Sequence, residues 1–273
     1  MNKLNFLLLL IIFIGMKIFP QGNIQPKEKV MNFFTAVENY SKGFNRDNKE
    51  GLFKSKQYTN QEVYDLAQKY YQAKAEDPIG FHFYLENKMK EFEEKFKNKT
   101  VKQSELMTPE KVGVIFKIIS SKYGRSFTEI IGIPWFLKVQ VLDIKQGKFN
   151  SSVGILGKTY LVAKVEEVIK GQNIFKEGDT IEINYLSTWL SDANKQFEKK
   201  KTYFTGLREW NCYNGNCTEI ALYVFPDEDD GIYPIENEHV TAPGNYFGIK
   251  DNIQWPEFKS EFVKKYVLSE VAK

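Results

Sequence analysis

The sequence is poor in the residue types on which several common kinds of site depend. Its 273 residues include only two His and two Cys, and its only Arg residues are Arg46, Arg125 and Arg208. Two His and two Cys leave little material for a zinc centre or a Cys-rich scaffold. Bidentate recognition of phosphate or guanine needs Arg, and the chain has no dense Lys/Arg patch. We therefore expect no nucleic-acid partner and predict no cofactor.

The sequence also lacks the short motifs of well-known catalytic sites. No H-E-x-x-H, G-x-S-x-G, P-loop or G-x-G-x-x-G segment is present. His82 lies between two Phe residues and His239 follows Glu238. A site that combines His239 with Ser187 or Ser191, or one made by a pair of carboxylates, has no local signature in its support. This absence favours a binding protein over an enzyme, and a hydrolase with an unrecognised carboxylate or Ser site stays open as the alternative.

A long apolar run occurs once, at the start of the chain. Leu4 to Met16 carry no charge, Lys3 precedes them and Lys17 follows. This run is shorter than the roughly 20 residues of a spanning helix, but it matches the apolar part of a secretory signal. We expect residues 1–22 to be a signal peptide, and the protein to be exported, either periplasmic or secreted. With the signal removed, 36 basic and 35 acidic residues remain, and no further transmembrane segment is expected.

Residues 23–130 are predicted to be a helical region. Apolar residues recur there at steps of three and four, the spacing of one buried helical face. The pattern begins after Pro26, after a cap at Asn60, after Asp77-Pro78, and after a cap at Thr108. Gly43 and Gly124 are predicted stops. The third of these segments carries its stripe on Phe81, Leu85, Met89, Phe92 and Phe96, between which charged residues form a solvated face.

Residues 131–273 are predicted to form an antiparallel barrel with a C-terminal helix. From Trp135 the apolar period changes from 3.6 to 2, which indicates strands at 137–141, 160–165, 180–185, 202–207 and 219–225. Turn residues separate them, and no helical pattern lies between. A last apolar helical face follows Trp255-Pro256. The predicted fold class is therefore α+β, with helices first and a five- or six-stranded barrel second.

Aromatic side chains beside the predicted strands are the candidate binding residues. They fall in or next to loops, where exposed rings are typical of ligand surfaces, although they could equally cover the barrel ends as core. The candidates are Tyr185, Trp189, Trp210 and Tyr213. An acidic loop nearby offers weak calcium ligands but lacks the spacing of an EF-hand, so a solvated loop is the simpler interpretation. Its carboxylates are Asp227, Asp229 and Asp230.

Part of the predicted barrel resembles a known family. The segments Val162–Gly171 (VAKVEEVIKG), Phe175–Ile183 (FKEGDTIEI) and Lys201–Phe204 (KTYF) have the rhythm of OB-like barrels of exported proteins, the tissue-inhibitor and netrin-like type. The likeness covers residues 135–240 and implies a binding or inhibitory module. The inhibitors' N-terminal zinc-chelating Cys is missing here, so protease inhibition does not carry over to any residue. The expected function is an exported, non-enzymatic binding module for a protein or small ligand.

Cys212 and Cys217 are expected to form a disulfide at the tip of a hairpin. Asn214-Gly215 between them is the strongest two-residue hairpin signal, because a type I′ turn needs positive φ at both positions. The two cysteines then become a non-hydrogen-bonded cross-strand pair with Cα atoms about 4.5 Å apart. A disulfide can bridge that separation, and an exported protein meets oxidising conditions.

Replacing both Cys212 and Cys217 with Ser should lower the melting temperature only modestly. The closed loop is short, so its loss costs about 2 kcal/mol by chain entropy, against a typical total stability of about 5–15 kcal/mol. Intact mass measurement of the non-reduced exported protein checks the bond itself. Two free thiols in that spectrum would contradict both the hairpin assignment and the case for export.

Overall fold

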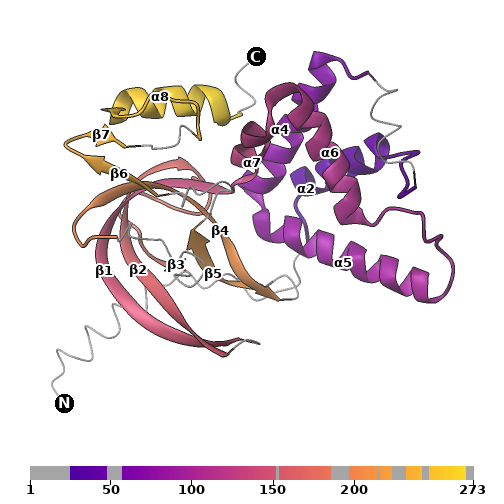
Figure 1. The fold of residues 1–273 in the computed structure, drawn as a ribbon, viewed down its shortest axis with the longest axis horizontal. Coiled ribbons are helices and arrows are strands. Elements are labelled where there is room, and N and C mark those ends of the chain that lie inside the picture. The colour runs from indigo at the N-terminus through magenta and orange to yellow at the C-terminus, as the bar shows by residue number, and fades with distance from the viewer. Residues whose placement is uncertain are drawn as a thin grey trace. The chain divides into compact units, whose positions relative to one another are not determined.

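The computed structural model of the chain describes residues 25–47, 57–151, 154–185, 197–213, 216–222, 232–241 and 246–268. It is a mixed α+β structure (Figure 1), which confirms the predicted class. The described residues fall into two compact units. Residues 25–134, with 264–268, belong to the helical unit, and residues 135–212 and 216–263 belong to the sheet unit.

Five helices make up the main part of the helical unit. They are α2 (Glu28–Tyr40), α4 (Asn60–Glu76), α5 (Pro78–Lys97), α6 (Thr108–Tyr123) and α7 (Arg125–Gly132). Their apolar faces meet in an aromatic core, in which the Phe33 ring lies 5.4 Å from Tyr70 and 5.5 Å from Phe81. Ile115 and Ile119 of α6 are fully buried. The predicted stripes of α2, α4 and α6, together with Phe81 of α5, therefore form the core of this unit.

Capping side chains set where two of these helices begin. Thr59, and not Asn60 as predicted, caps α4: its hydroxyl accepts from the Glu62 N–H while the Glu62 carboxylate accepts from the Thr59 N–H. This reciprocal capping box satisfies two donors that the helix leaves free. Asp77 caps α5 by accepting from the Gly80 N–H.

The α6 and α7 boundaries differ from the expectation. The predicted cap Thr108 is already the first residue of α6, since Met107 is the capping position. Gly124 does end α6, at φ +88°, but the chain begins α7 at the very next residue. Without a Cβ, Gly124 can take a left-handed conformation that redirects the backbone within one residue. A glycine interpreted only as a stop therefore concealed a short helix.

The sheet unit contains an eight-stranded sheet. Its strands are β1 (Trp135–Ser151), β2 (Gly154–Lys170), β3 (Thr180–Tyr185), β4 (Thr202–Tyr213), β5 (Asn216–Leu222), β6 (Ile232–Glu236), β7 (His239–Val240) and β8 (Ile253–Gln254). The hydrogen-bonded order is β1-β2-β3-β5-β4-β6-β7-β8, and β1 also pairs with β4. The prediction of five or six strands missed β6, β7 and β8, of which the last two are only two residues long.

The β1–β4 pairing closes the order of five strands on itself. Trp135 lies opposite Leu207 and Gln140 opposite Thr202, so the order β1-β2-β3-β5-β4 returns to β1, although the strands are not evenly spaced round an axis. Strand directions cannot alternate round a ring with an odd number of members, so one pair must be parallel. That pair is β3 with β5. The prediction of a wholly antiparallel arrangement was wrong for this reason.

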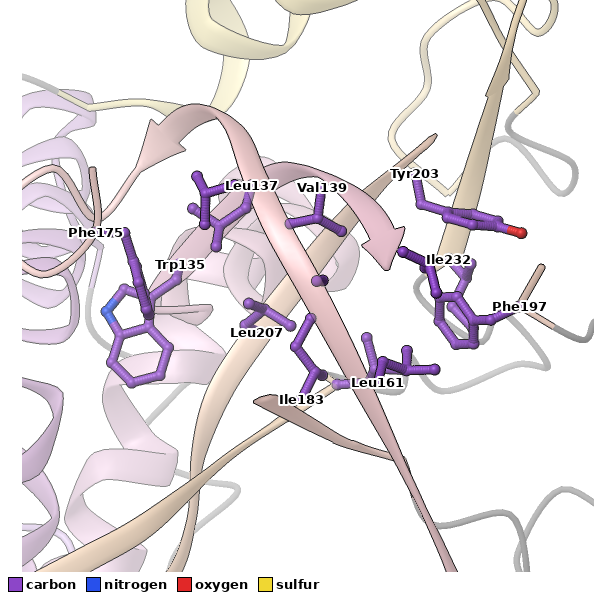
Figure 2. Close-up of a cluster of buried hydrophobic side chains, with 14 residues drawn as sticks. Trp135, Leu137, Val139, Leu161, Phe175, Ile183, Phe197, Tyr203, Leu207 and Ile232 are labelled. Carbon is purple, nitrogen blue, oxygen red and sulfur yellow. The ribbon is translucent and has the colours of Figure 1, made fainter. Parts of the chain in front are cut away.

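The space between these strands is filled with apolar side chains. Residues that alternate along each strand point inward, so Leu137 and Val139 of β1 meet Leu161 of β2 and Ile183 of β3 (Figure 2). Trp135 closes one end of the cluster, with its ring perpendicular to that of Phe175 and 5.3 Å away. All of these side chains are buried. The interior described here is therefore a packed core.

Helix α8 (Trp255–Tyr266) covers the outer face of β1 and β4. The Phe262 ring lies 4.7 Å from Phe136 and 5.1 Å from Phe204, and Phe258 lies 5.2 Å from Phe204. At the start of the helix the Glu167 carboxylate accepts from the Trp255 indole N–H at 2.9 Å. A predicted C-terminal helix is thus confirmed, and it removes one outer face of the sheet from solvent.

Phe204→Ala should cost about 3–5 kcal/mol of stability, because it leaves a cavity among rings that cannot collapse together. Phe204 is fully buried and contacts six aromatic rings. Urea unfolding followed by circular dichroism measures the loss. Met31→Ala is the control, since Met31 is 41% exposed and its truncation should cost well under about 1 kcal/mol. Equal losses in the two variants would contradict the assigned core.

Candidate functional site

The predicted binding aromatics fall at the margins of the described residues. Tyr185 is the last residue of β3, and Trp210 and Tyr213 lie within the last four residues of β4. The structure describes the backbone at these three positions and not the side chains. Trp189 lies outside the described residues, as do the three calcium candidates Asp227, Asp229 and Asp230. Their roles stay predictions.

Strand direction separates these aromatics along the sheet. Ile183 and Asn184 of β3 lie opposite Ile220 and Ala221 of β5, and the two strands are parallel. Tyr185 is therefore at the end where β5 finishes. Trp210 and Tyr213 precede the start of β5, which is the other end of that strand. The pairing thus does not gather the predicted aromatics at one strand end.

The two cysteines lie on neighbouring strands. Cys212 belongs to β4 and Cys217 to β5, and only Asn214 and Gly215 separate the two strands. Because β5 is parallel to β3, and β1 is antiparallel to both β2 and β4, β4 and β5 must run antiparallel. The cysteine side chains lie outside the description, so the disulfide stays a prediction.

The outward-facing residues of β1, β2, β3 and β5 form the best candidate site, because α8 does not cover this side. Lys145 lies opposite Tyr160, Tyr160 opposite Asn184, and Asn184 opposite Ala221. Their neighbours Leu161 and Ile183 point into the core, so this row points outward. We call this surface the polar outer face: Asp143, Lys145, Tyr160, Val162, Glu182, Asn184 and Glu219.

A buried amide lies at the centre of the polar outer face. Asn184 is only 1% exposed although it points away from the core. Its side-chain N–H donates to the Glu219 carboxylate on β5 at 2.6 Å. Its carbonyl oxygen is buried and has no hydrogen-bond partner. A buried acceptor left unpaired costs about 1–3 kcal/mol. Because this oxygen is shielded from solvent, it lowers the stability of the sheet and is not itself a contact for a ligand on the face.

Ion pairs flank this amide on the neighbouring strands. Lys145 of β1 contacts Glu182 of β3 at 2.5 Å. Nearer the start of β4, Lys199 contacts Asp143 at 2.6 Å. The hydrogen bond from Lys199, helped by the Ile144 N–H, lowers the pKa of Asp143 from its ordinary value. The face therefore carries fixed charges of both signs, an arrangement that orients a polar ligand without favouring polyanions.

Both histidines have local partners: His82 pairs with Glu86 on its own helix at 3.1 Å, and His239 contacts the Asn237 carbonyl and the Gln254 amide. Ser187 and Ser191 lie outside the description. Within the described ranges, no group of three or more His, Cys, Asp and Glu residues could hold a metal ion.

Comparison of the chain with protein-family models, curated proteins and solved structures gives no match in any of the three. Among the helices described, none combines the length and apolar character that a membrane span requires.

Sequence reasoning did not single out the Asn184–Glu219 pair. In TIEINY the residues Thr180, Glu182 and Asn184 are the polar half of a regular alternation, which predicts a solvent-facing row. Glu219 opens the predicted strand 219–225 and carries no distinguishing signal either. The pairing of β3 with β5 brings the two together from 35 positions apart in the chain, and no local pattern reports a contact of that range.

Asn184→Asp should destabilise the protein by about 2–4 kcal/mol at pH 7, because it places a buried carboxylate against the partly buried carboxylate of Glu219. In the folded variant the new carboxyl and that of Glu219 lie close enough to share one proton, whereas in the unfolded chain they are apart. The pKa of the folded pair is therefore higher than the value of about 4 that carboxyls have in the unfolded chain. The loss should therefore shrink as the pH falls through this raised value. Urea midpoints between pH 4 and 8 measure it.

Asn32→Asp is the matched control for this change, since Asn32 is exposed and donates to Glu28 on the same helix at 3.5 Å. It should cost less than about 0.5 kcal/mol at any pH in the range. A pH-independent loss in the Asn184→Asp variant would show that the Glu219 contact is not the cause.

Proposed function

We propose that the chain is an exported, non-enzymatic binding module built on an OB-like barrel, and that its ligand binds on the polar outer face. The observation that carries the proposal is the strand order β1-β2-β3-β5-β4 with β1 against β4 and β3 parallel to β5. The OB-fold is a five-stranded, partly open Greek-key barrel that binds its ligands across strands 2 and 3. The polar outer face lies on the corresponding strands.

The packed core favours a ligand site on the surface of the sheet over one in its interior. Apolar side chains fill the space between the strands (Figure 2), and α8 covers the face of β1 and β4. The face of β2 and β3 is the remaining broad surface of the five strands. Its accessible groups, the Lys145–Glu182 ion pair and the partly exposed Tyr160, favour a ligand that presents polar groups of complementary charge, either a small molecule or a side chain of a protein.

Retention of a ligand by the immobilised full chain tests this function. The chain is exposed to an extract of the exported fraction, and bound material is identified by mass spectrometry. We expect a component that wild type retains and that Asn184→Leu releases, because the substitution removes the donor that holds the Glu219 carboxylate in place on the face. Tyr160→Ala, at a partly exposed position, tests the same face without disturbing the buried pair.

Asn32→Leu is the matched control, since it removes an Asn–Glu hydrogen bond from the helical unit and should retain the component fully. Retention that is equal in all variants would contradict the assigned face. Turnover of chromogenic esters, glycosides or peptides by the wild-type chain would favour the alternative, an extracellular hydrolase, and would contradict a purely binding role.

A further inference from the structure

Helix α5 carries an apolar stripe that the helical unit buries only in part: Leu85, Met89 and Phe92 are partly exposed, and Phe96 is exposed. Phe81, in its first turn, contacts Phe33 and Phe34 in the core. Every residue from His82 to Lys97 is at least partly exposed. The second half of the helix extends past α2, α4 and α6 (Figure 1). The predicted core stripe thus leaves the core after one turn.

The exposed stripe has the spacing of a coiled-coil seam. Leu85, Met89, Phe92 and Phe96 follow one another at steps of four, three and four, which places them at successive d, a, d and a positions of a heptad. Phe92 and Phe96 stack with their rings 9° apart, and Phe96 is 45% exposed. A seam confined to a and d positions is narrower than the face by which helices pack into globular cores.

Charged residues line the two edges of this seam in a self-complementary way. Glu86 and Glu93 occupy the e positions, and Lys88 and Lys95 occupy the g positions. In a parallel pair of helices a g residue meets the e residue five positions further along the partner, so Lys88 meets Glu93 of the second copy, twice by symmetry. In an antiparallel pair g meets g and e meets e, which places Lys against Lys and Glu against Glu.

A membrane surface fits this helix less well. Interfacial helices combine a broad apolar face with a cationic polar face. From Glu86 to Lys97, α5 carries four Lys and four Glu, so its polar face has no net charge, and its apolar stripe is only one seam wide. The balanced charges favour a helix of matching pattern over an anionic lipid surface.

We propose that the exposed stripe of α5 is a self-association surface on which α5 of a second copy of this chain docks in parallel. Leu85, Met89, Phe92 and Phe96 form the seam, and Lys88 with Glu93 fixes the orientation. Within the part of the chain that the structure describes, Glu93 makes no ion pair, so it is available to the second copy. The seam is about two heptads long, and the dimer is accordingly weak and concentration-dependent.

Sedimentation equilibrium of the purified full chain over a wide concentration range tests the proposal. Wild type should show a monomer–dimer equilibrium. Lys88→Glu and Glu93→Lys should each raise the dissociation constant about tenfold, since each turns two attractive contacts into repulsive ones. An equimolar mixture of these two variants should associate as tightly as wild type or tighter, because both contacts are then attractive.

Lys97→Glu and Glu94→Lys are the matched controls, with the same charge changes at exposed positions away from the seam. They should leave the dissociation constant unchanged. Lys88 also hydrogen-bonds Glu91 within the helix at 2.7 Å, so thermal melting of each variant checks the fold, and recovery in the mixture excludes a folding defect as the cause of weaker association.

Four results would overturn the proposal. The first is a wild-type chain that stays monomeric at every concentration that remains soluble. The second is a dimer that Lys88→Glu weakens no more than Lys97→Glu does, which would place the interface elsewhere. The third is a tighter dimer in either single variant, which would indicate the antiparallel arrangement. The fourth is flotation of monomeric wild type with anionic phospholipid vesicles that Phe92→Glu abolishes, which would assign the stripe to a membrane.

Discussion

The sheet unit depends on the hydrogen bonds between β1 and β4. These strands begin 67 positions apart in the sequence, and their pairing, from Trp135 with Leu207 to Gln140 with Thr202, turns an open row of strands into a ring. Once β4 lies beside β1, the following strand β5 has one free edge to join, between β4 and β3. The parallel β3–β5 pair, the packed interior and the position of Asn184 all follow from that closure.

The same closure divides the surface into two outer faces with different chemistry. On β1 and β4 the outward residues Phe136 and Phe204 are apolar, and α8 buries them beneath Phe258 and Phe262. On β2 and β3 most outward residues are polar or charged, with Val162 the exception among those of the polar outer face, and the inward neighbours supply the core. An alternating strand has only two faces, so a packed core on one side leaves the other side to be either covered by another element or open to solvent.

The sequence predicted secondary structure well where one period dominates. The helical stripes of α2, α4 and α6, the residues of β3 and the start of α8 at Trp255 agree with the structure. Prediction from the sequence placed element boundaries wrongly where a local signal had two interpretations. Gly124 was taken as an end and is also the cap before α7. Asn60 follows the true cap, Thr59, by one position, and both residue types are good caps. β7 and β8 are too short to show any period.

The sequence by itself determined the α+β class, the order of helices before strands and the polar or apolar face of each element, because these depend on periodicities of two or 3.6 residues that local chemistry imposes. Only the tertiary structure decided which strands are neighbours, that one pair must be parallel, that Asn184 is buried against Glu219, and that the stripe of α5 stays exposed. Each of these features depends on contacts between residues far apart in the chain. Loop-closure and packing energies select among the possible contacts, and no local sequence pattern encodes those energies.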